Sequence, residues 1–177
     1  MKKNSLGILA GLCVLLTGCG GTKFVNEAKE SNNKTTVEVK QTLSLKGYKD
    51  GTGDFALTTK SNEEYLDGAI QGIFGVGEVE GDVKVVTTGK ETGTWTKDAD
   101  SGVVTLTTFE LVMQVKVTGD GAEDYLDILE TTYTLAYGEE NADKLIAGEK
   151  VTITYEDGYK SYIKLDEANK TFSGVLG

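Results

Sequence analysis

Few side chains of this protein are able to do chemistry. The 177-residue chain contains no histidine, and all 18 of its basic residues are lysine, so arginine is absent as well. Without histidine there is no Ser-His or Cys-His nucleophile pair, no imidazole general base and no histidine-bound metal. Without arginine there is no planar fork that binds carboxylate or phosphate through two parallel hydrogen bonds. Any catalysis would have to come from carboxylates, lysine, serine or tyrosine.

None of these residue types forms a catalytic motif. The chain has 28 acidic residues, so carboxylate pairs arise by chance at strand ends and no glycosidase-like pair can be singled out. The glycine-rich stretch Gly72–Gly77 (GIFGVG) lacks the lysine and the preceding strand of a phosphate-binding loop. No nucleophile elbow is present. We therefore predict that the protein is not an enzyme and holds no cofactor.

Two acidic, glycine-containing stretches look like the opening of a calcium-binding loop. In the first, Asp98–Gly102, the fifth position is glycine, and Phe109 stands where the bidentate glutamate of an EF-hand is needed. The second, Asp50–Asp54, has two carboxylates around glycines and also fails to complete the pattern. Hairpin turns explain both stretches, and we predict no metal site.

The N-terminal residues form a targeting segment. Lys2 and Lys3 precede an apolar run from Leu6 to Leu16, which is 11 residues long. A run of this length is typical of a signal peptide, because a bilayer-spanning helix needs about 20 apolar residues. We therefore expect residues 1–18 to be removed and to contribute nothing to the fold.

The end of this segment, Leu16-Thr17-Gly18-Cys19, resembles the lipobox of bacterial lipoproteins. The resemblance implies that Cys19 receives a diacylglyceryl group, that the chain is cut between Gly18 and Cys19, and that the protein is anchored to the cell membrane and faces outward. A plain secretory signal that happens to contain cysteine is the alternative. Because the other cysteine, Cys13, lies inside the apolar run, the mature chain has no partner for a disulfide.

Charge sets limits on the partners. The formal net charge is −10, and a nucleic-acid-binding surface must be basic, so we expect no nucleic-acid partner. Anionic lipid headgroups would also repel the chain, which leaves the acyl chains on Cys19 as the expected membrane contact.

Downstream of Cys19 the pattern of hydrophobic residues changes at about residue 35. Residues 19–34 are rich in glycine, asparagine and charge, and we interpret them as a lipidated cysteine followed by a flexible tether. From residue 35 to 177 the apolar residues recur with period two, which predicts a single all-β, mainly antiparallel domain. The expected architecture is a meander of about eight to ten strands in a barrel or sandwich. The expected strands cover residues 36–46, 53–60, 79–88, 92–97, 103–118, 125–137, 150–156, 159–165 and 171–175.

Four local patterns refine this expectation. In Val103–Thr118 the apolar parity changes near Thr107, which predicts a bulge or corner. A three-residue loop, Glu156–Gly158, is expected to form a hairpin that pairs Tyr155 with Tyr159. A capping-box pattern followed by helical spacing predicts one short helix near residues 62–74. A second helical turn is expected between residues 141 and 147.

The aromatic residues provide the candidate binding site. The hairpin around Gly93-Thr94-Trp95 resembles one in lipocalin-like bacterial lipoproteins, which implies a calycin-type barrel with an internal cavity. Trp95, Tyr133 and Tyr137 are then the predicted ligand-contacting residues, although packing in a β core would explain all three equally well. The functional hypothesis is a lipid-anchored extracytoplasmic module for a small apolar ligand. The alternative is an envelope lipoprotein that binds another protein or has a structural role.

Lipidation is testable at Cys19. Because the thiol of Cys19 is the predicted attachment atom, Cys19→Ala should abolish metabolic labelling with a fatty acid and leave an uncleaved precursor or a released soluble form. Cys13→Ala is the matched control and should remain labelled. A labelled Cys19→Ala protein would refute the lipobox assignment.

Overall fold

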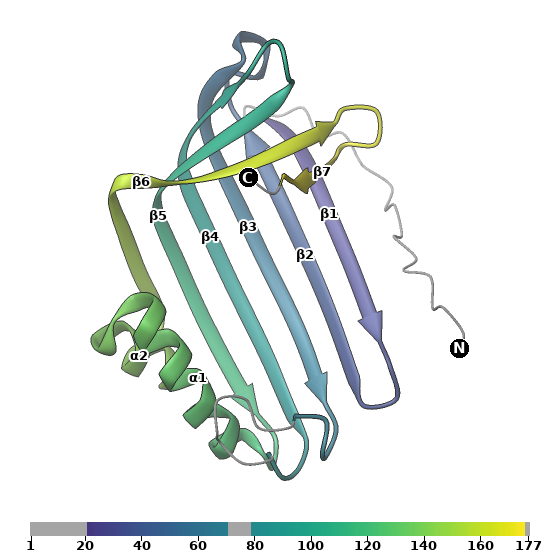
Figure 1. Ribbon diagram of the computed structural model, residues 1–177, viewed down its shortest axis with the longest axis vertical. Helices are drawn as coiled ribbons and strands as arrows, with labels where there is room; N and C mark the ends of the chain where they lie inside the picture. The colour runs from purple at the N-terminus through teal and green to yellow at the C-terminus, as the bar shows by residue number, and fades with distance from the viewer. Residues whose placement is uncertain (1–20, 71–78, 176–177) are drawn as a thin grey trace.

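A computed structural model describes residues 21–70 and 79–175 of the chain. The all-β, mainly antiparallel fold is confirmed: seven strands form one sheet in which each strand pairs with the next along the chain (Figure 1). The strands are β1 (Thr22–Ser31), β2 (Thr35–Leu45), β3 (Thr52–Tyr65), β4 (Val83–Lys97), β5 (Val103–Thr118), β6 (Val151–Asp166) and β7 (Thr171–Gly174). A 3₁₀ turn, η1 (Tyr48–Asp50), follows β2, and the helices α1 (Ala122–Tyr137) and α2 (Glu139–Ile146) connect β5 to β6.

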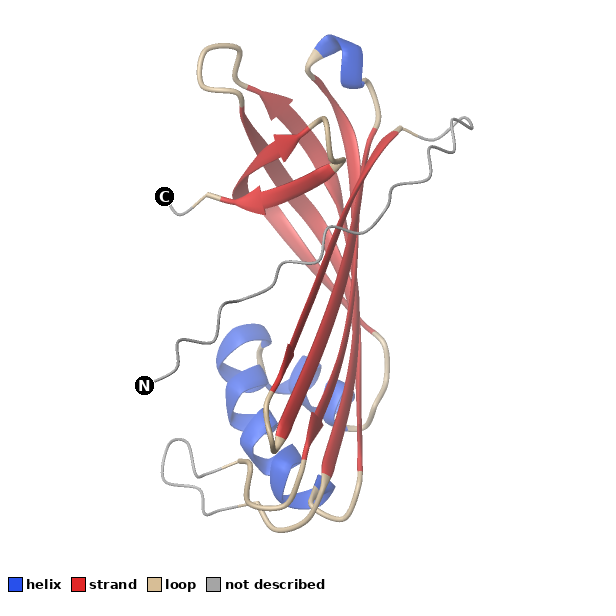
Figure 2. Ribbon diagram, turned by 90° about the vertical axis from the view of Figure 1, so that its right-hand side faces the viewer, coloured by secondary structure: helices blue, strands red, loops and turns tan. Residues whose placement is uncertain are grey.

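The sheet curls into a nearly closed barrel. At one end the two edges of the sheet meet, since the Val25 amide donates to the Lys170 carbonyl at 2.8 Å and the Asn26 side chain donates to the Phe172 carbonyl at 2.5 Å. At the other end the sheet stays open, and both helices lie against its concave side (Figure 2). We call these the closed end and the helix-covered end.

A hydrophobic cluster, the closed-end core, fills the first of these ends. Trp95 is 1% exposed at its centre, its ring lies 6.0 Å from that of Tyr48, and its indole N–H donates to the Lys46 carbonyl at 2.8 Å. The indole thus satisfies its one polar group while burying a large apolar surface. The remaining buried members are Phe24, Leu43, Leu45, Phe55, Leu57, Val104, Leu106, Ile163 and Phe172.

A second cluster, the helix-side core, joins the helices to β4, β5 and β6. Ile128 of α1 and Leu145 of α2 pack on inward-facing strand residues such as Val85 and Val115. Burying an aliphatic side chain of this size contributes about 1.5–3 kcal/mol. The lower part of the barrel is therefore held by helix packing and not by strand closure.

The segment 125–137, which we expected to be a strand, is helix α1. Leu135 shares its parity with Tyr133 and Tyr137, which suggests an alternating strand, but Leu135 is 85% exposed. The residues that pack inward are instead spaced by four, from Tyr125 through Leu129 and Tyr133 to Tyr137. Helical period prevails because it places all four on one face. The helical turn expected at 141–147 is confirmed as α2.

The expected bulge in β5 is confirmed and marks a corner of the barrel. Glu110 pairs with Thr154 and Thr108 pairs with Tyr159, so Phe109 on β5 faces the four residues 155–158 on β6. Residues 155–158 therefore do not form the tight hairpin predicted from Glu156–Gly158. Both strands continue through the corner, because β5 and β6 are paired both before and after residues 155–158.

The tether interpretation is wrong for residues 22–31, which form β1 and pair with β2 along their whole length. This strand contains several charged residues and few apolar ones, so its sequence lacks the alternating apolar pattern that predicts a strand. Phe24 supplies the anchoring contact, since its side chain is fully buried in the closed-end core.

The helix expected near 62–74 is absent from the part of that range that the structure describes. Residues 62–65 complete β3 and pair with β2 on one side and β4 on the other. This pairing gives their backbone N–H and C=O groups hydrogen-bond partners, so the capping box is not needed for that purpose. Residues 71–74 lie outside the described residues. Seven strands replace the expected eight to ten: β4 and β6 each unite two predicted strands, 125–137 is helical, and β1 is a strand that was not predicted.

The corner is testable at Gly158. This residue has φ of 73°, and an added Cβ would lie 2.5 Å from Thr107 and 3.0 Å from Phe109. Gly158→Val should therefore lower the free energy of unfolding by about 1–3 kcal/mol, measured by chemical denaturation. In the matched strand variant Gly89→Val the new Cβ has no neighbour closer than 3.9 Å, and stability should not fall. Equal stability of both variants would contradict the strained corner.

A candidate ligand-binding hollow

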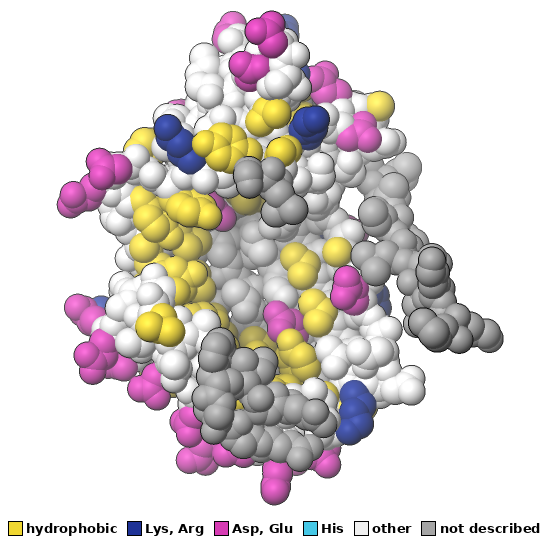
Figure 3. Space-filling view, viewed as in Figure 1, with side chains coloured by type: hydrophobic (Ala, Val, Ile, Leu, Met, Phe, Trp, Pro, Cys, Tyr) yellow, Lys and Arg dark blue, Asp and Glu magenta, His cyan; other side chains and the backbone are white. Residues whose placement is uncertain are grey.

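Between the two cores the inner face of the barrel carries small side chains. Alternation along β3 and β4 places Thr59, Thr87 and Gly89 on the same face as the buried Leu57 and Val85. These three residues are half-buried, and the nearest atom to a Cβ built on Gly89 is 3.9 Å away. The space-filling view shows a hollow at the centre of this face, between groups of hydrophobic side chains (Figure 3). We call this region the hollow.

Two carboxylates face the hollow from its floor. Glu63 of β3 accepts hydrogen bonds from Ser61 Oγ at 2.9 Å and from Tyr65 Oη at 2.5 Å. Glu91 of β4 accepts one from Thr108 Oγ1 at 2.9 Å, and Thr108 is 1% exposed. Glu63 pairs with Val85, six residues before Glu91 on β4, so the two carboxylates lie about 20 Å apart along the strand direction.

Tyrosines of α1 form the wall opposite this floor. Tyr125, Tyr133 and Tyr137 lie on the helix face that packs inward, and their positions span about 18 Å of helix, close to the separation of the two glutamates. The Tyr125 ring lies 6.0 Å from that of Tyr65, and the Tyr133 and Tyr137 rings are also 6.0 Å apart.

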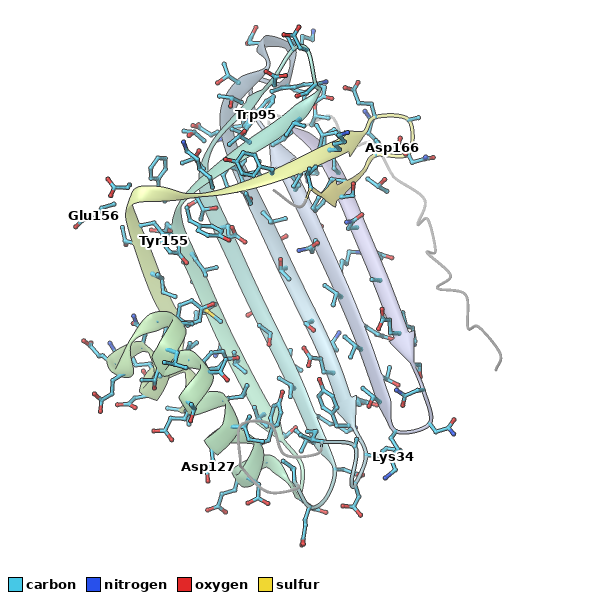
Figure 4. The ribbon with its side chains drawn as sticks, viewed as in Figure 1. Lys34, Trp95, Asp127, Tyr155, Glu156 and Asp166 are labelled. Atoms are coloured by element: carbon cyan, nitrogen blue, oxygen red, sulfur yellow. The ribbon has the colours of Figure 1, made fainter. Side chains whose placement is uncertain are left out.

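Tyr155 and Tyr159 extend the aromatic surface at the corner. Their rings lie 5.9 Å apart, and Tyr159 is 60% exposed. Figure 4 shows Tyr155 at the bend of β6, far from Trp95 at the closed end and from Asp127 on α1. The aromatic surface therefore runs from the helix to the rim of the hollow.

The electrostatic environment keeps these phenols protonated. Burial raises the pKa of Tyr65, and the hydrogen bond and charge of Glu63 raise it further. Burial, followed by the charge of Glu63, raises the pKa of Tyr125. Burial and the neighbouring Tyr125, Tyr137 and Glu63 raise the pKa of Tyr133 to about 12. The charge of Glu63 therefore contributes to the raised pKa values of Tyr65, Tyr125 and Tyr133.

Lysines on the floor strands point away from the hollow. Strand alternation puts them on the outer face of the barrel, where they are exposed. Lys97 is the exception to this alternation: it lies two residues beyond Trp95 and pairs with Glu167 at 2.9 Å. The outward-facing lysines of β2 to β5 are Lys40, Lys60, Lys84, Lys90 and Lys116. Helix α1 contains no lysine. Within the described residues, neither Glu63 nor Glu91 forms an ion pair.

The structure places the predicted site residues in two regions. Tyr133 and Tyr137 line the hollow, from a helix and not from the expected strand. Trp95 belongs to the closed-end core, so its predicted contact with a ligand gives way to a packing role. Cys19 and Gly18 lie outside the described residues. Glu63, Glu91 and Tyr125 also face the hollow but were not among the predicted site residues. Of these three, only Tyr125 could have been found from the sequence, through the four-residue spacing of inward-facing residues in α1.

Other classes of site find no support in the described residues. No group of three or more acidic or cysteine side chains in residues 21–70 and 79–175 is arranged to hold a metal ion. Across the same residues, neither helix is both long enough and apolar enough to cross a membrane. No protein-family model, curated protein or solved structure matches the chain. The hollow must therefore be interpreted from its own residues.

The raised phenol pKa values predict loss of stability at alkaline pH. A group that holds its proton more tightly in the folded state stabilises the fold fully below its unfolded pKa of 10.0 and loses this contribution as pH rises through its folded pKa, about 12 for Tyr133. The melting temperature should therefore fall above about pH 10, and Tyr133→Phe should fall less steeply. Tyr162→Phe, at a side chain 43% exposed, is the control and should follow the wild type. Identical slopes for all three would argue against a buried Tyr133 phenol.

Proposed function

We propose that this protein is a lipid-anchored extracytoplasmic module that binds a small ligand with an apolar body in the hollow. The observation that carries the proposal is the set of small inner-face residues, Thr59, Thr87 and Gly89, between two packed cores and beneath a tyrosine wall. A stable barrel normally fills such positions with large aliphatic side chains. Small side chains at these positions bury less apolar surface than aliphatic ones would, and they leave space on the inner face of the barrel. A binding site for a small ligand requires such space.

The position of β1 bears on how such a module would sit. If Cys19 carries the lipid, two residues, Gly20 and Gly21, lie between it and Thr22, the first residue of β1, and the three steps from Cys19 to Thr22 span at most about 11 Å. Strand β1 begins at the closed end, where Phe24 is buried. The closed end would then lie at the membrane surface, and the helix-covered end would project away from it.

A protein partner remains the second candidate function. Phe109 and Tyr159, at the corner, are 40% and 60% exposed. Exposed aromatic side chains are enriched in protein interfaces. A partner bound at the corner would not occupy the hollow. Filling the hollow with a larger side chain should therefore weaken ligand binding but leave partner binding unchanged.

Ligand binding is testable with a neutral, environment-sensitive dye such as N-phenyl-1-naphthylamine, titrated into residues 20–177. Binding should be saturable with about one site per chain, and Gly89→Phe should weaken it at least about tenfold, since a ring at residue 89 fills the hollow. Thr88→Phe places the same ring on the exposed outer face and should leave binding unchanged. Dye emission is the readout because Trp95 is 1% exposed in the closed-end core.

The dye experiment has two contrary outcomes. Absence of saturable binding to the wild type would refute the proposed function. Equal binding by wild type and Gly89→Phe would place the dye outside the hollow and favour the exposed corner.

A further inference from the structure

We propose that the hollow selects organic cations, with an alkylated ammonium group held between the carboxylate of Glu63 and the rings of Tyr65 and Tyr125. This inference rests on the proposed function, since it names the chemical class of ligand for the same hollow. It follows from how the barrel distributes charge, from the unused bonding capacity of Glu63 and from the aromatic rings beside it.

The barrel separates its charges between its two faces. On β3 and β4 the outer face mixes acids and lysines, as in the Glu64–Lys84 ion pair at 3.2 Å, whereas the inner face presents Glu63 and Glu91 with no lysine near them in the described residues. Figure 3 shows the same pattern, with acidic side chains within the hollow and lysines only at its periphery.

This field excludes anionic ligands. Carboxylates, phosphates and sulfates would meet two glutamates in a partly desolvated space on a chain of net charge −10. Like charges repel more strongly there than in bulk water, because water screens them less. A cation, in contrast, gains the attraction of carboxylates that lack an ion-pair partner.

Glu63 retains the capacity to hold such a cation. Its two oxygens each accept one hydrogen bond, from Ser61 and from Tyr65, whereas a carboxylate has about four acceptor positions. Both donors are neutral hydroxyl groups, so they orient the carboxylate and leave its negative charge uncompensated. The side chain is fixed in place for a charged partner that the protein does not supply.

The neighbouring rings favour an alkylated ammonium over a metal ion. The rings of Tyr65 and Tyr125 lie 6.0 Å apart with an interplanar angle of 39°, and Tyr133 lies close enough to Glu63 for its phenol to be affected by that charge. Aromatic faces attract ammonium groups and bury their methyl groups, whereas hard metal ions need six or more oxygen ligands. Glu63 accepts a hydrogen bond from one of these tyrosines, Tyr65, and the ring of the other lies 6.0 Å from the Tyr65 ring.

Three probes of nearly the same shape test the inference. Choline carries a cationic trimethylammonium group, 3,3-dimethylbutan-1-ol has a neutral tert-butyl group in its place, and 3,3-dimethylbutanoate joins a tert-butyl group to an anionic carboxylate. Tyrosine ring-proton shifts report binding directly. Choline should bind at least about tenfold more tightly than the neutral alcohol, and the carboxylate should not bind. Glu63→Gln should remove the preference for choline. Glu64→Gln, which removes a neighbouring charge on the outer face, should retain it.

The outcomes separate this inference from the function on which it rests. If the neutral dye binds in the hollow but choline and the alcohol bind equally, or if Glu63→Gln retains the preference, the cation inference is overturned and the proposed function stands. If neither the dye nor choline binds, the proposed function itself fails.

Discussion

The corner at which β5 and β6 bend together determines the shape of the whole barrel. Phe109 is the extra residue of β5 in its pairing with β4, and on β6 Gly158 makes the turn with a positive φ of 73°. Beyond this corner β6 crosses toward β1, which allows the loop after β6 to bond to Val25 and close the sheet. Before it, β6 diverges from β1 and leaves space for α1. The closed-end core, the hollow and the helix-side core therefore depend on one local change of direction.

The sequence was sufficient to predict the fold class and the position of this corner. Both depend on the two-residue spacing of apolar residues along a strand, which is a local property of the sequence. The change of parity near Thr107 indicates where the residues that face inward change from even to odd numbers. It was insufficient for α1, where Tyr133, Leu135 and Tyr137 fit a strand and Tyr125, Leu129 and Tyr133 fit a helix. Only the tertiary environment distinguishes the two, because it buries the four-spaced set and leaves Leu135 85% exposed.

The candidate site was only partly predictable for a related reason. Tyr133 and Tyr137 could be identified by residue type alone, although the sequence assigned them to a strand. Glu63 and Glu91 could not be distinguished among 28 acidic residues, because facing inward depends on strand register and on the end of β3, which the sequence assigned to a helix. The sequence left ligand contact and core packing open for Trp95, because its place at the closed end is set by pairing with Leu106 and by contact with Tyr48.

The division of the interior into two cores explains how the barrel tolerates a polar centre. An inner-face Val or Leu in place of Thr87 or Gly89 would stabilise the fold by about 1.5–3 kcal/mol if fully buried, and a half-buried carboxylate without an ion-pair partner loses part of its hydration. The closed-end core and the helix-side core each pack independently of these positions. Stability therefore resides at the two ends of the barrel. The residues between them are released from packing, so the packing of the two cores does not explain their small size and negative charge.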